Sequence, residues 1–278
     1  MYSRRRNYKS DSYKLLSKET LYLAALGAVI IGLLCFFFYT GINHSSKISF
    51  AKSVSNIAEN NAKEIFKVDK IVLYSSCDAT TNESINQAFW NLNIHQYTDI
   101  AIYLKYGDDS KENIIKELYI DQISFQQTPN LGDYGLYYKD LNYFGKLEVL
   151  PETKIEDCLK FNIINTNEPL DTSYPNIDNA LSTPITLEYL NKNMKENYSI
   201  SNEVGKLIFD GSLLKKSFVT PNSLKATISF NINIINQSGE LFICNVCTDI
   251  PLDNIYEGSV KKELNDLTCR FFKGGNYE

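Results

Sequence analysis

The sequence predicts a mainly β protein with one N-terminal transmembrane helix, followed by a short helix and an antiparallel β-sandwich-like extracytoplasmic domain. Two observations lead to this fold class. An uncharged apolar stretch runs from Leu21 to Thr40, and from Lys70 onward short strand-like runs alternate with turn-rich pieces. The 19 Tyr and 15 Phe among 278 residues also favour strands, because aromatic side chains suit a pleated, half-buried surface.

The apolar stretch reads LYLAALGAVIIGLLCFFFYT and contains no charged residue. About 20 such residues span a hydrocarbon core of roughly 30 Å, and the stretch lacks the polar face of a helix in a soluble domain. It is longer than the roughly 7–15 apolar residues of a cleavable signal, and no small-x-small cleavage motif follows it. We therefore expect a retained transmembrane helix over residues 21–41, with the lipid bilayer as its partner.

Basic residues set the expected orientation. Residues 1–20 form a short basic tail, and the span is followed closely only by Lys47 and Lys52. The positive-inside rule places this tail in the cytoplasm and the C-terminal bulk outside the cell membrane. We interpret the run SRRRNYK as this topology signal, although its composition also suits contact with nucleic acid or anionic lipid. The net charge of −5 argues against a nucleic-acid partner for the rest of the chain.

The chain after the span divides at about residue 70. Residues 42–69 are expected to form a juxtamembrane stalk or helix, because apolar residues recur at helical spacing between Ile48 and Phe66; a dimerising helix is the alternative. Residues 70–278 are expected to form one β-rich extracytoplasmic domain, and a division near residues 167–179 is the alternative. The expected strands cover residues 71–77, 99–106, 117–125, 134–140, 154–164 and 185–190.

The clearest expected hairpin covers residues 224–252. Apolar and polar residues alternate from Leu224 to Ile234, the turn residues Asn-Gln-Ser-Gly follow, and the return strand contains Cys244-Asn-Val-Cys247. Residues three apart on a regular strand point to opposite faces, so this Cys-x-x-Cys is not expected to hold a metal or act as a redox pair. A bulge in the strand would change that expectation.

The cysteines also allow a disulfide in an oxidising compartment. Cys244 and Cys269 both fall on the apolar side of their expected strands, and we predict that they are bonded to each other. With Cys35 in the apolar stretch, five cysteines remain outside it. At least one of the five must then be unpaired or pair with another chain.

The sequence contains no recognisable catalytic motif. The sequence has two histidines, His44 and His95. His44 is interpreted as an interfacial loop residue just past the membrane, and His95 as a hydrogen-bonded or exposed loop residue. Asp108-Asp109 and Asp133 resemble no complete calcium loop and are interpreted as solvated turns. No cofactor and no metal site is therefore predicted. A carboxylate pair of the glycosidase type stays open, because sequence spacing cannot locate one in a β fold.

Four tyrosines within GDYGLYYKDLNYFG are the ligand-binding candidates: Tyr134, Tyr137, Tyr138 and Tyr143. Tyr137 and Tyr138 are adjacent, so on a strand they cannot both face the core. Exposed tyrosines suit a polar partner such as a glycan or a protein, because the ring is apolar and its tip is polar. The alternative is that one of the two packs inside while the other covers the strand edge.

These observations favour a single-pass membrane protein that presents a β-sandwich outside the cell for binding or assembly, rather than an enzyme. One alternative is a membrane-anchored extracytoplasmic hydrolase that uses carboxylates. A pocket holding two close carboxyl groups with shifted pKa values would favour it. The other alternative is an accessory subunit of a membrane complex, in which the anchor itself is the interface.

Overall fold

The computed structural model describes residues 65–86, 89–107, 114–147, 153–164, 170–171, 173–201, 208–265 and 269–276, together with Tyr22, Leu26, Ile30 and Ile31, whose backbone is helical. The chain divides into two compact units, residues 1–59 and residues 60–278. The expected transmembrane helix and stalk lie almost entirely outside the described residues. Within the described part of the chain, no helix has both the length and the apolar character needed to cross a membrane.

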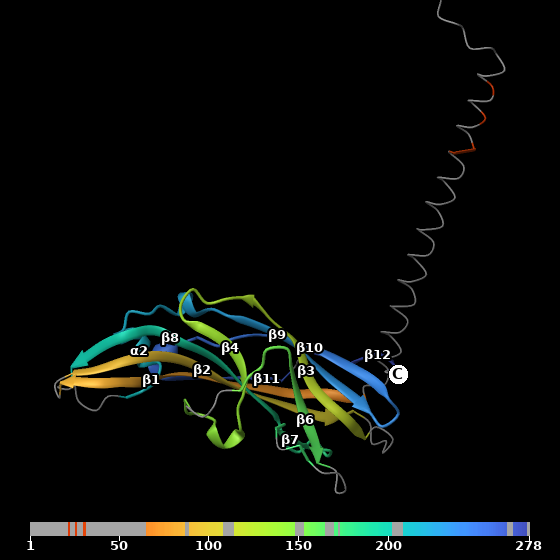
Figure 1. The fold of residues 1–278 in the computed structure, drawn as a ribbon, viewed down its shortest axis with the longest axis horizontal. Helices are drawn as coiled ribbons and strands as arrows, with labels where there is room; N and C mark the ends of the chain where they lie inside the picture. The colour runs from red at the N-terminus through yellow and green to blue at the C-terminus, as the bar shows by residue number, and fades with distance from the viewer. Residues whose placement is uncertain are drawn as a thin grey trace, which may run out of the picture. The chain divides into compact units, whose positions relative to one another are not determined.

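Residues 60–278 form two six-stranded sheets (Figure 1). Sheet A has the order β11-β1-β2-β8-β4-β5, and sheet B has the order β12-β10-β9-β3-β6-β7. Neighbouring strands are antiparallel apart from β6 and β7, which are parallel. The prediction of a mainly β, sandwich-like fold is therefore confirmed.

The bounds of the elements follow the chain. The strands are β1 (Phe66–Asn86), β2 (Phe89–Tyr106), β3 (Ile115–Gln127), β4 (Asp133–Tyr138), β5 (Thr153–Lys154), β6 (Cys158–Ile164), β7 (Asn176–Asp178), β8 (Ile185–Ser201), β9 (Thr227–Asn236), β10 (Glu240–Asp249), β11 (Ser259–Leu264) and β12 (Phe272–Asn276). The short helices are η2 (Leu141–Tyr143), α2 (Ser212–Lys216), η3 (Pro221–Leu224) and η4 (Ile255–Glu257).

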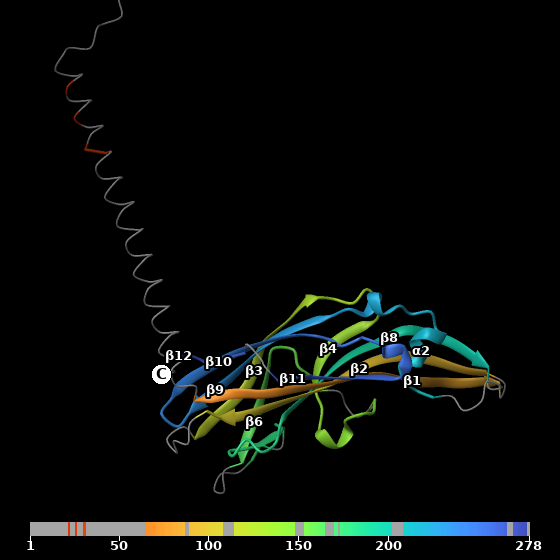
Figure 2. The ribbon, with the colours of Figure 1, turned by 180° about the vertical axis from the view of Figure 1, so that it is seen from behind.

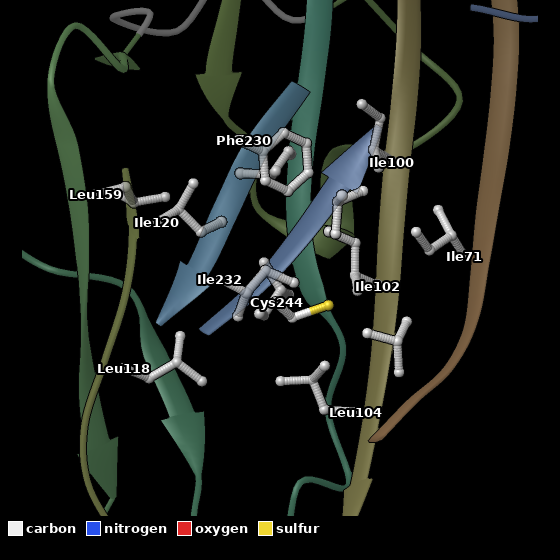
Figure 3. Close-up of a cluster of buried hydrophobic side chains, with 14 of the residues drawn as sticks. Ile71, Ile100, Ile102, Leu104, Leu118, Ile120, Leu159, Phe230, Ile232 and Cys244 are labelled. Atoms are coloured by element: carbon white, nitrogen blue, oxygen red, sulfur yellow. The ribbon is translucent and has the colours of Figure 1, made fainter. Parts of the chain in front are cut away.

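The main core lies between the two sheets. Alternate residues of each strand point inward, so Ile100 and Ile102 of sheet A meet Phe230 and Ile232 of sheet B, and all four side chains are fully buried (Figure 3). Cys244 belongs to the same cluster and is also fully buried. Burial of this apolar surface is the main force that holds the sheets together.

Three strands of sheet A extend beyond the main core. β1, β2 and β8 have 21, 18 and 17 residues, whereas β9 and β10 have 10 each. Over the extension, α2 and η4 cover the sheet in place of sheet B (Figure 2). A second apolar cluster forms there, in which Cys77 and Ile94 contact residues such as Leu213, Leu214 and Ile255. The long strands are therefore covered in two sections by different elements.

The hairpin expected over residues 224–252 is present as β9 and β10. Their pairing runs without a shift from Leu241↔Ile235 to Asp249↔Thr227. Because the register is regular, Cys244 points into the core and Cys247 is exposed on the opposite face. The expected separation of the two thiols is confirmed, and its cause is the period of two along a strand.

Two expected boundaries differ from the structure. β1 begins at Phe66, so residues 66–69 belong to the sheet rather than to a stalk. β2 includes the whole segment around His95, which is 7% exposed and lies within the strand. The interpretation of His95 as a loop residue was wrong, because β2 begins before His95 and pairs with a strand on each side. Neighbouring side chains can bury a polar residue at such a position.

Candidate functional site

A buried lysine on the outer face of sheet A joins two carboxylates. Asp99 on β2 and Glu188 on β8 are direct cross-strand partners, and their side chains point away from the main core. Lys139 follows β4 immediately and reaches both of them. Its Nζ lies 2.6 Å from Asp99 Oδ1 and 2.8 Å from Glu188 Oε1. We call these three residues the Lys139 cluster.

The Lys139 cluster holds the segment 139–147 against the sheet. Lys139 Nζ also donates to the carbonyl of Lys146 at 2.7 Å. The amide of Gly145 donates to Asp99 Oδ2 at 2.5 Å, and the hydroxyl of Tyr97 donates to the carbonyl of Gly145 at 3.0 Å. Both carboxylate oxygens of Asp99 therefore bind groups of this segment. The ion pairs connect the segment to two neighbouring strands of sheet A.

The electrostatics of the Lys139 cluster follow from its burial. The side chains of Lys139, Asp99 and Glu188 are 5%, 1% and 7% exposed. Burial raises the pKa of Asp99, while the ammonium of Lys139 opposes that rise. Desolvation also raises the pKa of Tyr97, whose ring lies 4.9 Å from Lys139 Nζ. Removing one charge would leave an opposite charge buried without compensation.

This arrangement suits a structural role, in which the ion pairs hold the segment 139–147 on sheet A, better than it suits acid–base catalysis. A glycosidase pair needs one carboxyl group beside the leaving oxygen and a second beside the reacting carbon or its water. Here the ammonium of Lys139 binds both carboxylates, and the segment 139–147 lies over them. This site was not predicted from the sequence. The signal available was a single charged residue within each apolar strand, in YTDIAIYL and ITLEYL.

A row of buried polar groups lies on the opposite, core-facing side of β2 and β8. Gln96 and Asn191 are direct cross-strand partners and both are fully buried. Among the described residues, neither side-chain atom of the Gln96 amide has a hydrogen-bond partner, and the same holds for Asn191 Oδ1 and the Tyr189 hydroxyl. Ser75 and Thr98 bond to each other at 2.6 Å beside this row. The row separates the two apolar clusters along the long strands.

His95 sits opposite an irregularity in β8. Asn193 has a φ of 53°, and its amide donates to His95 Nδ1 at 3.1 Å. Because Nδ1 accepts, the proton of the neutral imidazole is on Nε2, which donates to Thr80 Oγ1 at 2.9 Å. Burial lowers the pKa of His95 to about 4, and Lys192 adds to the shift. The neutral ring therefore fits this site and the charged ring does not.

The structure does not place the four candidate tyrosines on one surface. Tyr134 and Tyr138 face the main core and are half-buried, whereas Tyr137 is buried on the outer face beside Tyr97. Tyr143 lies in η2 and is half-buried. The expectation that Tyr137 and Tyr138 point to opposite sides holds. Ligand binding by these residues stays a prediction, without the shared exposed surface that motivated it.

The two cysteines of the expected disulfide are neighbours in the structure. All five described cysteines are free thiols, but Cys244 and Cys269 are within hydrogen-bonding reach of each other. The interaction between the two thiols lowers the pKa of Cys269 to about 7 and raises that of Cys244. The thiolate is favoured at Cys269 because Cys269 is the more exposed of the two. The disulfide itself stays a prediction.

The other candidate ligands do not gather around a common point. Within the described residues, no group of three or more His, Cys, Asp or Glu side chains is arranged to hold a metal ion. Asp133 is exposed at the start of β4, while Asp108-Asp109 and His44 lie outside the described residues.

Neither a protein-family model, nor a curated protein, nor a solved structure matches this chain. A functional assignment must therefore come from its own residues.

Proposed function

We propose that this protein is a single-pass membrane protein that presents its β-sandwich outside the cell for binding or assembly. The observation that carries the proposal is the uncharged stretch Leu21–Thr40, preceded by six basic residues and followed closely by two. The β-sandwich belongs to a separate compact unit, residues 60–278. An anchor joined to a separately packed domain suits a protein that displays a surface.

The Lys139 cluster argues against a role for its own carboxylates in hydrolysis. Its two carboxylates bind one ammonium and the backbone of the segment 139–147. These contacts use the charges to stabilise the fold. The carboxylate-based hydrolase is therefore the less favoured alternative.

Extraction with alkaline carbonate tests the anchoring. The full chain is expected to remain in the membrane pellet, because about 20 apolar residues hold a protein in the bilayer without electrostatic contacts. A matched variant lacking residues 21–40 is expected to appear in the supernatant. Release of the full chain by carbonate would contradict the proposal. Retention of the shortened variant in the membrane pellet would show that residues outside 21–40 anchor the chain.

A further inference from the structure

The end of α2 places a phenylalanine in a conformation that usually belongs to glycine. Phe218 has a φ of 60°. The amide of Val219 donates to Leu214 O at 2.9 Å, and the amide of Phe218 donates to Lys215 O at 3.3 Å. This pair of bonds is a Schellman motif, in which the left-handed position is most often Gly because a Cβ is disfavoured there. The backbone is strained at Phe218.

The side chain of Phe218 gains nothing from burial that would offset this strain. It is 91% exposed, while Leu214 and Val219, whose backbones are joined by the 2.9 Å bond, are 0% and 4% exposed. The turn is also fixed by side chains from other elements. Tyr198 donates to Lys216 O at 2.9 Å and Tyr256 donates to Val219 O at 2.8 Å. A residue with a disfavoured backbone conformation and an exposed side chain is a candidate for a role outside the fold itself.

The segment that contains Phe218 carries more basic than acidic residues. Residues 208–225 contain three lysines and one acid, Asp210, whereas the chain carries −5. Lys215 and Lys216 are exposed beside Phe218. Asp210 uses its carboxylate to accept a bond from the Ser212 amide at 2.8 Å. The turn therefore presents one aromatic ring flanked by two exposed ammonium groups.

We infer that this turn docks on a lipid surface with anionic headgroups. The ring of Phe218 enters the boundary between headgroups and acyl chains, and Lys215 and Lys216 pair with phosphate groups. A lipid surface accepts a single protruding ring, whereas a stable protein interface needs about 800 Å² of complementary surface on each partner. The inference rests on the proposed anchoring, which would keep the domain close to a bilayer.

Photocrosslinking in the full chain tests the docking. The substitution Phe218→benzoylphenylalanine is made in protein reconstituted into vesicles of phosphatidylcholine with phosphatidylglycerol, and into vesicles of phosphatidylcholine alone. The matched control is Phe272→benzoylphenylalanine on β12, where Phe272 is 42% exposed. Only protein retained after a carbonate wash is scored, so failure of the anchoring is seen separately as loss of protein from the vesicles.

We expect a several-fold higher yield of lipid adduct at position 218 than at position 272, and a higher yield with the anionic lipid. Adding Lys215→Gln and Lys216→Gln should remove the dependence on anionic lipid. A lipid adduct at position 218 no more abundant than at position 272 would overturn the inference. So would an adduct formed mainly with protein, whether a second copy or another chain, since the turn would then be a protein interface.

The variant Phe218→Gly tests the strain independently. Glycine adopts a positive φ without a Cβ penalty, so the melting temperature is expected to rise by about 2–4 °C. If Phe218 serves docking, it should lower the stability of the fold relative to glycine at the same position. An unchanged or lower melting temperature would remove the argument that Phe218 is held there against the preference of the fold.

Discussion

Replacing Lys139 by methionine is expected to lower the free energy of unfolding by about 3–5 kcal/mol, the range found when one partner of a buried ion pair is removed. Methionine retains most of the length of the side chain but leaves Asp99 and Glu188 buried together without a cation. The contact with the Lys146 carbonyl is lost as well. Urea unfolding followed by circular dichroism measures the change.

A compensated variant distinguishes charge from packing. With Asp99→Asn and Glu188→Gln added to Lys139→Met, we expect most of the lost stability to return, because no uncompensated charge stays buried. Limited proteolysis should cut the segment 139–147 in the single variant faster than in the native protein. A loss below about 1 kcal/mol in the single variant, the value of an exposed ion pair, would show that the Lys139 cluster does not hold this segment.

Acidification from pH 6.5 to pH 4 is expected to destabilise the protein through His95. The pKa of this histidine is lowered to about 4 in the folded protein, so in this range the unfolded chain binds the proton and the folded chain does not. The contribution of neutral His95 is complete above pH 6.5 and is lost as the pH falls through the window. A shift from 6.5 to about 4 corresponds to about 3 kcal/mol.

The variant His95→Gln isolates this effect from other titrating groups. The pKa values of Asp78 and Asp99 are raised by burial, so their protonation acts in the opposite direction. Both carboxyl groups are present in the native protein and in the variant, so the difference between the two urea series reports His95. The native protein should lose about 3 kcal/mol more than the variant across the window. If the free energy of unfolding fell equally with pH in the native protein and in the variant, His95 would not be held neutral in the folded protein.

The parts of the fold that depend on local alternation could be predicted from the sequence. The hairpin β9–β10 follows from a regular period of two and a turn-rich Asn-Gln-Ser-Gly, and the same period separates Cys244 from Cys247. The opposite directions of Tyr137 and Tyr138 follow from adjacency alone. In each case the pattern of residues close together in the sequence is enough to predict the feature.

The Lys139 cluster could not be predicted in this way. Asp99 lies on β2, Glu188 lies on β8 and Lys139 directly follows β4. Asp99 and Glu188 are 89 residues apart in the chain although they are direct partners in the sheet. Sequence periodicity shows which face a residue takes, but it does not show which strands become neighbours. A charged residue in an apolar strand indicates that a buried partner exists, but the sequence does not show which residue that partner is.

Phe218 illustrates a second kind of limit. In the sequence it follows Lys215-Lys216-Ser217 and looks like an ordinary apolar residue. Its significance appears only when the backbone angle and the exposure are known together. Both depend on how α2 ends, and glycine, the usual sign of such an ending, is absent.

Labelling of native cysteines in intact cells tests the proposed topology most directly. Cys158 and Cys247 are exposed, whereas Cys77 and Cys244 are fully buried, so the folded domain has natural labelling sites and internal controls. An impermeant maleimide is expected to modify Cys158 and Cys247 without permeabilisation. A variant with Cys158→Ser, Cys247→Ser and Cys269→Ser, which also removes the partly exposed thiol of Cys269, should lose that label. Modification of these two cysteines only after permeabilisation would place the β-sandwich inside the cell and contradict the proposed function.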